Sequence, residues 1–170
     1  MRDWWLRLLL VLQAPRPVFA ALREGDADDR AEPVLLVVSV VGIALAAHAS
    51  TDLGGLEFAA WALLAGLLTG AVVYWFFGAV LFVAARALGS EGTYRRARHV
   101  LAFACVPLAL ALLLWPTPDA LFRWGTVALA LWSAALLVLG VRAVHGWSWP
   151  RAVAAAAAPI AVGALALALG

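Results

Sequence analysis

Residues 58–85 form an uninterrupted apolar run that contains no Asp, Glu, Lys, Arg or His. At about 1.5 Å per residue, a helix of this length exceeds the roughly 30 Å of hydrocarbon in a bilayer. The whole chain follows the same trend, because 66% of its residues are hydrophobic and only 13% are charged. This excess is too large for a water-soluble core. The sequence therefore predicts an all-α membrane protein whose helices satisfy their own backbone hydrogen bonds.

Turn and helix-start residues divide the rest of the chain into further apolar segments. Pro33 suits a first helical turn, and residues 89–92 and 116–118 have the composition of compact turns. We predict a bundle of five transmembrane helices within residues 33–170. The helices are expected at about 33–49, 58–86, 93–115, 119–144 and 150–169.

Residues 1–32 are predicted to form a separate cytoplasmic N-terminal region. Over residues 3–13, two tryptophans and several leucines lie beside Arg2, Arg7 and Gln13, which suits a short amphipathic helix lying in the headgroup region. Pro15 and Pro17 should break this helix, and residues 18–22 could form another turn that dips into the interface. An acidic linker completes the region.

The arginines are distributed unevenly over the predicted loops. Arginine supplies all 12 basic residues, and every one except Arg123 falls before the first helix or in the second-to-third and fourth-to-fifth connections. Because cytoplasmic loops carry the excess of positive charge, the N-terminus is expected in the cytoplasm and the C-terminus outside. The absence of Lys and Asn suggests GC-rich bacterial coding, so we expect a bacterial cytoplasmic membrane.

Gly66 and Gly70 form a G-x-x-x-G pattern in the second predicted helix. Such glycines allow two helix backbones to approach closely, because neither contact residue carries a side chain. Two interpretations stay open at this point, namely packing inside the bundle and a seam between two copies of the chain.

Pro107 and Pro159 fall near the middle of the third and fifth predicted helices, where each should produce a kink. Paired broken helices can frame a transport site. No predicted crossing carries an ionisable residue at its centre, which argues against a pump. A small transporter or lipid-translocating protein is therefore the alternative function.

Residues 93–99 place an aromatic and basic cluster at the cytoplasmic start of the third helix, with Tyr94 followed by Arg95, Arg96 and Arg98. Arginine binds phosphate through a two-pronged fork, and free helix amides also favour anions. The cluster could hold an anionic lipid headgroup or an acidic protein partner, or it could simply fix the topology.

Candidate catalytic and metal-binding residues are sparse. Ser90 sits in a polar loop without G-x-S-x-G spacing, and we do not expect it within hydrogen-bond reach of His99 or His145. His48 and the other histidines are isolated, and the acidic residues 26–32 lack calcium-loop spacing. We therefore expect no catalytic residues, no metal site, no cofactor and no enzymatic activity.

Residues 88–96 and 99–107 resemble the Yip family of membrane proteins, in which a Gly-rich turn, an aromatic-basic pair and an apolar helix reaching a proline follow one another. Residues 15–22 and Pro33 are similar to the start of the same domain. The resemblance implies a five-helix bundle with a cytoplasmic N-terminus. Eukaryotic members act in vesicle traffic with Rab-type GTPases and with one another, but this chain lacks their Asp-Leu-Tyr-Gly-Pro segment. The resemblance names a domain and not a reaction.

Together these features predict a non-enzymatic membrane organiser or adaptor. The bilayer is its first partner, and the arginine-rich cytoplasmic face should bind anionic lipid headgroups or a membrane protein, which includes a second copy of the chain. No nucleic-acid partner is expected.

Overall fold

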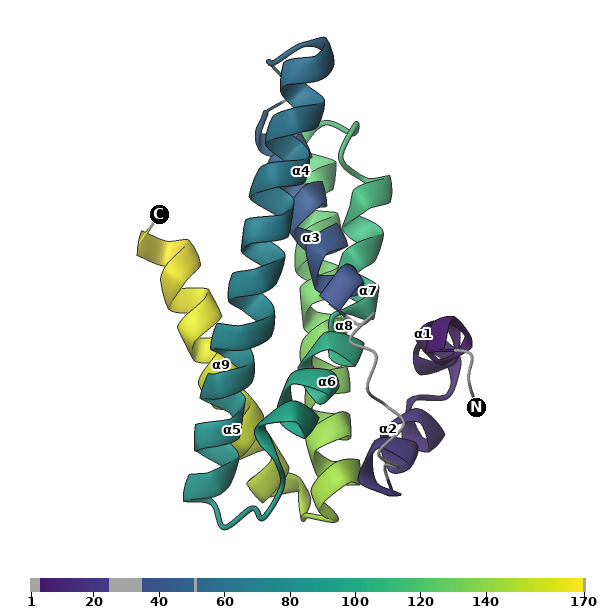
Figure 1. Ribbon diagram of the computed structural model, residues 1–170, viewed down its shortest axis with the longest axis vertical. Helices are drawn as coiled ribbons and strands as arrows, with labels where there is room; N and C mark the ends of the chain where they lie inside the picture. Colours follow the sequence, from purple (N-terminus) through teal and green to yellow (C-terminus); the bar gives the residue numbers. More distant parts are fainter. Residues whose placement is uncertain (1–3, 25–34, 51, 170) are drawn as a thin grey trace.

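The computed structural model describes residues 4–24, 35–50 and 52–169, and Figure 1 shows them as a bundle of helices along one long axis. No β-strand occurs in the described ranges, which confirms the all-α prediction. The helices are α1 (Trp4–Gln13), α2 (Pro15–Glu24), α3 (Leu35–Ala49), α4 (Gly55–Val72), η1 (Val73–Phe77), α5 (Gly78–Ala87), α6 (Tyr94–Ala104), α7 (Val106–Ala109), η2 (Leu110–Leu113), α8 (Asp119–His145) and α9 (Trp149–Leu169).

Two continuous rods are long and apolar enough to cross a membrane. One is Gly55–Ala87, which joins α4, η1 and α5, and the other is α8. Tyr94–Ala104 and Val106–Leu113 provide a third span if they are taken as one helix broken by a bend of 48°. α3 and α9 are apolar but shorter over their described cores, Leu36–Ala49 and Trp149–Leu165. The structure thus agrees with a multi-pass membrane protein, whereas the count of five crossings stays a prediction.

Successive rods run in opposite directions along the bundle (Figure 1). The turn between α3 and α4 and the turn before α8 lie at one end, drawn uppermost, while loop 88–93 and turn 146–148 lie at the other. In the interior, α5 packs against α6 and α9, and α8 packs against α6 and α9. These loops are the polar segments that the sequence placed between helices.

The N-terminal helices belong to the core of the protein rather than only to the membrane interface. α2 begins at Pro15 and packs against α8, and its side chains Val18, Phe19 and Leu22 are buried. The Phe19 ring occupies the space beside Gly140, where an added Cβ would lie 2.8 Å from it. The segment expected to dip into the interface is therefore packed on the bundle. The predicted acidic linker runs from Glu24, which ends α2, to Glu32, and its residues 25–32 lie outside the described residues.

Gly66 and Gly70 bring α4 into close contact with α3. A Cβ on Gly66 would lie 2.6 Å from the backbone nitrogen of Ile43, and one on Gly70 would lie 2.7 Å from Cα of Ser39. Gly42 of α3 approaches α4 equally closely, because its Cβ would lie 2.5 Å from the carbonyl oxygen of Gly66. The glycine pattern thus serves packing between neighbouring helices of one chain.

The two prolines behave differently. Pro107 is buried at the start of α7, directly after the 48° bend that separates α6 from α7. Proline has no amide hydrogen to continue the helical ladder, which accounts for a break at this position. Pro159 lies inside α9, which continues on both sides of it as one helix from Trp149 to Leu169.

A π-helical turn, Val73–Phe77, interrupts the longest rod, and the apolar pattern gave no indication of it. The Tyr94 hydroxyl donates a hydrogen bond of 2.7 Å to the Trp75 carbonyl oxygen inside this turn. Such π-turns occur mostly as single insertions and often at functional positions.

Candidate functional site

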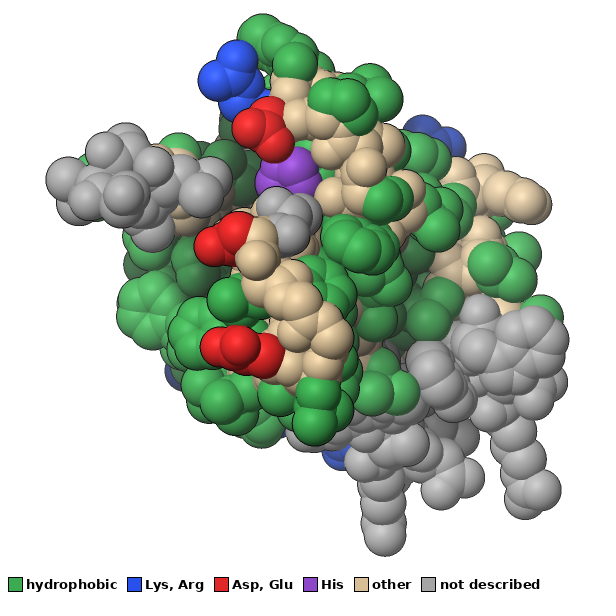
Figure 2. All heavy atoms as spheres, turned by 90° about the horizontal axis from the view of Figure 1, so that it is seen from above, with side chains coloured by type: hydrophobic (Ala, Val, Ile, Leu, Met, Phe, Trp, Pro, Cys, Tyr) green, Lys and Arg blue, Asp and Glu red, His purple; other side chains and the backbone are tan. Residues whose placement is uncertain are grey.

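The two ends of the bundle differ in charge. Figure 2 looks onto the end that contains the α3–α4 turn, where acidic side chains and a histidine are gathered. The residues there are Asp52, Glu57, Asp119, His48 and Arg123. The opposite end carries arginines from several helices, as the uneven distribution in the sequence predicted.

The predicted basic cluster does not form one surface. Arg98 lies between two aromatic rings, with its guanidinium carbon 4.9 Å from the centroid of Tyr74 and 4.7 Å from that of Tyr94. Gly78 leaves room for it, since a Cβ there would lie 2.5 Å from Cγ of Arg98. Arg98 therefore lies beside the start of α5, and the adjacent His99 is buried.

Arg96 faces a different neighbour. Together with His145 it lines a small cavity of about 10 Å³ between α5, α6 and α8, whose other walls are apolar, including Leu81 and Val100. A cavity of this size holds about one water molecule. Arg95 is half-buried. The predicted run thus divides between the Tyr74 and Tyr94 rings, which hold Arg98, and the cavity beside His145, which Arg96 lines.

Ser90 and His145 lie within hydrogen-bond distance, so the expectation that they would not was wrong. Ser90 Oγ is 3.2 Å from His145 Nδ1, and the same oxygen accepts a 2.9 Å hydrogen bond from the Gly92 amide. In a catalytic triad a carboxylate orients the histidine and stabilises its charged form. Here the charged groups beside the ring are the guanidinium groups of Arg96 and Arg151. The pair therefore has the geometry of a link between two loops.

A stack of planar groups extends this link. The His145 ring stacks on Trp147 with centroids 4.5 Å apart, and the Arg151 guanidinium lies 4.3 Å from the Trp147 ring. Arg151 also donates from Nε to the Leu88 carbonyl oxygen at 2.9 Å. Gly89, with φ of 82°, lies against Arg151, where a side chain would be strained. The stack fixes loop 88–93 to turn 146–148.

Further arginines lie beside loop 88–93 and turn 146–148. Arg86 donates to the Ser90 carbonyl oxygen at 3.0 Å, and Arg142 lies 4.4 Å from the Trp149 ring. Arg23 of α2 lies beside Gly146. We call Arg23, Arg86, Arg142 and Arg151 the basic rim.

The basic rim differs from the cluster chosen from the sequence. Arg23, Arg86 and Arg151 are exposed. In the sequence the rim arginines are scattered, and they indicated only the topology. The predicted site was limited to the arginines that are clustered in the chain, Arg95, Arg96 and Arg98. The alternation Trp147, Trp149, Arg151 beside a helix end was the signal that could have indicated the rim.

The long apolar helices and a charged end with stacked tryptophans define a multi-pass integral membrane protein. The family model of the Yip1 domain matches residues 9–170, so the chain belongs to the Yip1 domain family. This confirms the resemblance noted in the sequence. No curated protein and no solved structure matches the chain.

Proposed function

We propose that this protein is a non-enzymatic membrane organiser that captures the headgroups of anionic phospholipids at the basic rim. The observation that carries the proposal is the position of Arg86 and Arg151. Both donate to carbonyl oxygens of the same loop, at Ser90 and Leu88, and both are exposed. Two guanidinium groups from α5 and α9 are thus held at one edge of the bundle.

These arginines retain capacity for a ligand. A guanidinium has five N–H donors in a rigid fork, and the loop carbonyls engage only part of them. A headgroup phosphate accepts such donors two at a time. The Arg151 guanidinium stacks on the Trp147 ring. Tryptophan prefers the headgroup level of a bilayer. Glu91 is the exposed acid on the same loop, so the rim keeps a strong positive excess.

The proposal includes five crossings, with the basic rim in the cytoplasm and the C-terminus outside. The positive-inside rule supports this orientation. Right-side-out vesicles provide the test, with single cysteines introduced as Asp52→Cys and Glu91→Cys. A membrane-impermeant maleimide should label the first at once and the second only after permeabilisation. The reverse order would overturn the orientation.

Native mass spectrometry tests the lipid site itself. The protein is purified in mild detergent and incubated with equal amounts of phosphatidylglycerol and phosphatidylcholine. Wild type and Arg123→Gln, at the opposite end, should retain phosphatidylglycerol preferentially, whereas Arg86→Gln/Arg151→Gln should retain both lipids equally. An unchanged preference in the double variant would overturn the proposal. A stoichiometric copurifying protein would instead favour the adaptor role.

A transporter is the second candidate, and the half-buried position of Arg98 between aromatic rings favours it. Ionisable residues inside a membrane bundle commonly mark a substrate pathway. Arg98 belongs to α6, the first half of the broken span, and it lies over Tyr74 of the π-turn. Flux of anionic solutes or lipids in proteoliposomes, compared between wild type, Arg98→Gln and Pro107→Ala, tests this role. Flux that neither variant changes would count against it.

A further inference from the structure

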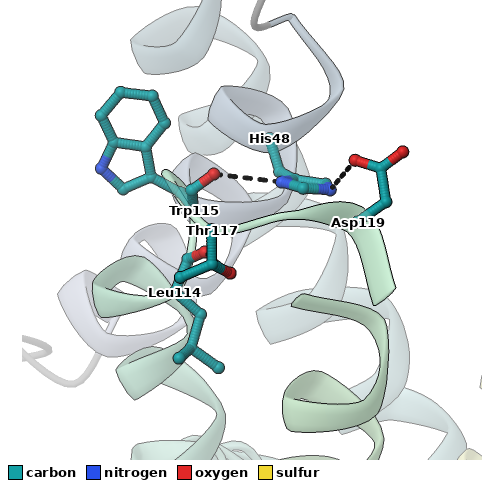
Figure 3. Close-up of polar contacts among 5 residues, drawn as sticks. All are labelled: His48, Leu114, Trp115, Thr117 and Asp119. Atoms are coloured by element: carbon teal, nitrogen blue, oxygen red, sulfur yellow. Dashed lines mark hydrogen bonds and ion pairs between the residues drawn. The ribbon is translucent and has the colours of Figure 1, made fainter. Parts of the chain in front are cut away.

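His48 joins the last turn of α3 to the start of α8 at the acidic end of the bundle (Figure 3). Its Nδ1 lies 3.1 Å from the Trp115 carbonyl oxygen, and its Nε2 lies 3.4 Å from a carboxylate oxygen of Asp119. The imidazole also stacks on Phe122, with centroids 3.6 Å apart and an angle of 12° between the planes. One side chain thus contacts three points on the neighbouring segment.

Both ring nitrogens of His48 face groups that can only accept a hydrogen bond. A carbonyl and a carboxylate each need an N–H donor, whereas a neutral imidazole has one N–H and the imidazolium has two. The C-terminal end of α3 and the face of the Phe122 ring also favour positive charge. All three contacts are therefore satisfied together only when His48 is protonated.

Two hydrogen bonds within residues 114–117 shape the turn that His48 contacts. The Thr117 hydroxyl donates to the Leu114 carbonyl oxygen at 2.6 Å, and the Thr117 amide donates to the same oxygen at 2.9 Å. This closes the turn and leaves the Trp115 carbonyl directed at His48 (Figure 3). The turn therefore presents the Trp115 carbonyl oxygen to the His48 imidazole in a fixed orientation.

The α3–α4 pair depends on such contacts at this end. The main packing partner of α4 is α3, and α3 in turn contacts α7 and η2. Near the turn, the pair meets the segment before α8 through His48 and through Phe58, whose ring centroid is 5.3 Å from that of Trp115. Loss of one His48 contact would therefore loosen the tip of the pair.

We propose that His48 is a proton-dependent clasp that holds the α3–α4 tip to α8. Histidine changes charge between about pH 5 and 8, so the Asp119 contact closes as pH falls and opens as pH rises. The other charged groups at this end are Asp52 in the turn, Glu57 of α4 and Arg123 of α8. This inference is independent of lipid capture at the basic rim.

The distance between two spin labels, measured by double electron–electron resonance in nanodiscs, tests the clasp. Labels are placed by Leu56→Cys and Leu121→Cys, two exposed sites in the first turns of α4 and α8, in a Cys105→Ala background. We expect a narrow, short distance distribution at about pH 5 and a broader, longer one at about pH 8.5. Identical distributions at the two pH values would overturn the proposal.

Matched variants identify the groups responsible. Asp119→Asn and His48→Gln should each abolish the pH response, while Asp52→Asn, a neighbouring exposed acid, should keep it. A response that persists in His48→Gln would assign it to another group and overturn the clasp. Because the Asp119 side chain is fully exposed, its replacement by the isosteric amide leaves packing intact.

Discussion

At one end of the bundle, Arg86 and Arg151 donate to main-chain carbonyls of loop 88–93, and Arg151 stacks on Trp147. At the other end, His48 contacts the Trp115 carbonyl and the Asp119 carboxylate. Both ends are closed by a nitrogen-bearing side chain that reaches across to a neighbouring turn. The difference lies in the acid–base chemistry of arginine and histidine.

Arginine stays charged at every pH that a cell experiences, whereas histidine does not. The basic rim therefore presents constant charge, which suits a permanent attraction for anionic headgroups. The His48 contacts depend on a proton, which suits an end whose geometry responds to its surroundings. The same bundle thus combines a fixed end with an adjustable one.

Replacing Gly66 by alanine should give the largest effect, because it separates the helix pair that carries the acidic end. The added Cβ would lie 2.6 Å from the Ile43 backbone nitrogen, which cannot move without shifting α3. We expect a loss of about 1–3 kcal/mol in the free energy of unfolding, measured in mixed detergent micelles. Gly54→Ala is the control, since its Cβ meets nothing within 4 Å. Equal stability of the two variants would contradict the close packing.

Ser90→Ala should weaken the basic end by a smaller amount. It removes the oxygen that accepts from the Gly92 amide and lies 3.2 Å from His145 Nδ1. Leaving such groups without a partner costs about 1–2 kcal/mol in unfolding free energy. Unfolding in detergent micelles measures this loss, and Ser148→Ala, an exposed serine of the neighbouring turn, is the control. Wild-type stability of Ser90→Ala would show that the link contributes nothing to the closed loop.

Several helix ends in the structure lie close to residues expected from the sequence. The rod expected over residues 119–144 is α8, and the one expected from 150 begins at Trp149. These features follow from length, hydropathy and turn residues, which act locally. The π-turn at Val73–Phe77 could not be predicted, because an extra residue in one turn leaves the apolar run unchanged.

The site was harder to predict than the fold. The side chain of an arginine five residues into a helix can point outward or against a neighbouring helix, and only the packing of α6 against Gly78 holds the half-buried Arg98 against α5. Ser90 and His145 are separated by 55 residues, so their contact depends on how two turns meet. Local sequence patterns carry no information about such long-range contacts.

Arg151→Lys separates charge from geometry at the basic rim, because it keeps the positive charge and removes the planar, two-pronged N–H donors of the guanidinium group. Lysine cannot make the paired planar donation to a carbonyl and a phosphate. An exposed ion pair contributes about 0.2–1 kcal/mol, so phosphatidylglycerol retention should fall by about fivefold at most. Native mass spectrometry with Arg123→Lys as the control measures the change. Retention equal to that of wild type would mean that charge alone attracts the lipid.

Thr117→Val, at the acidic end, should have the smallest effect, and it is the counterpart of Ser90→Ala. The Thr117 hydroxyl bonds to a carbonyl three residues away, and the Thr117 amide still donates to that oxygen when the hydroxyl is lost. We expect a loss of about 0.5 kcal/mol or less in the free energy of unfolding. Ser90 joins two distant turns, and its amide partner Gly92 has no such replacement among the described contacts. If Thr117→Val lost as much unfolding free energy as Ser90→Ala, the turn that His48 contacts would depend on the Thr117 hydroxyl as strongly as the basic end depends on the Ser90 hydroxyl.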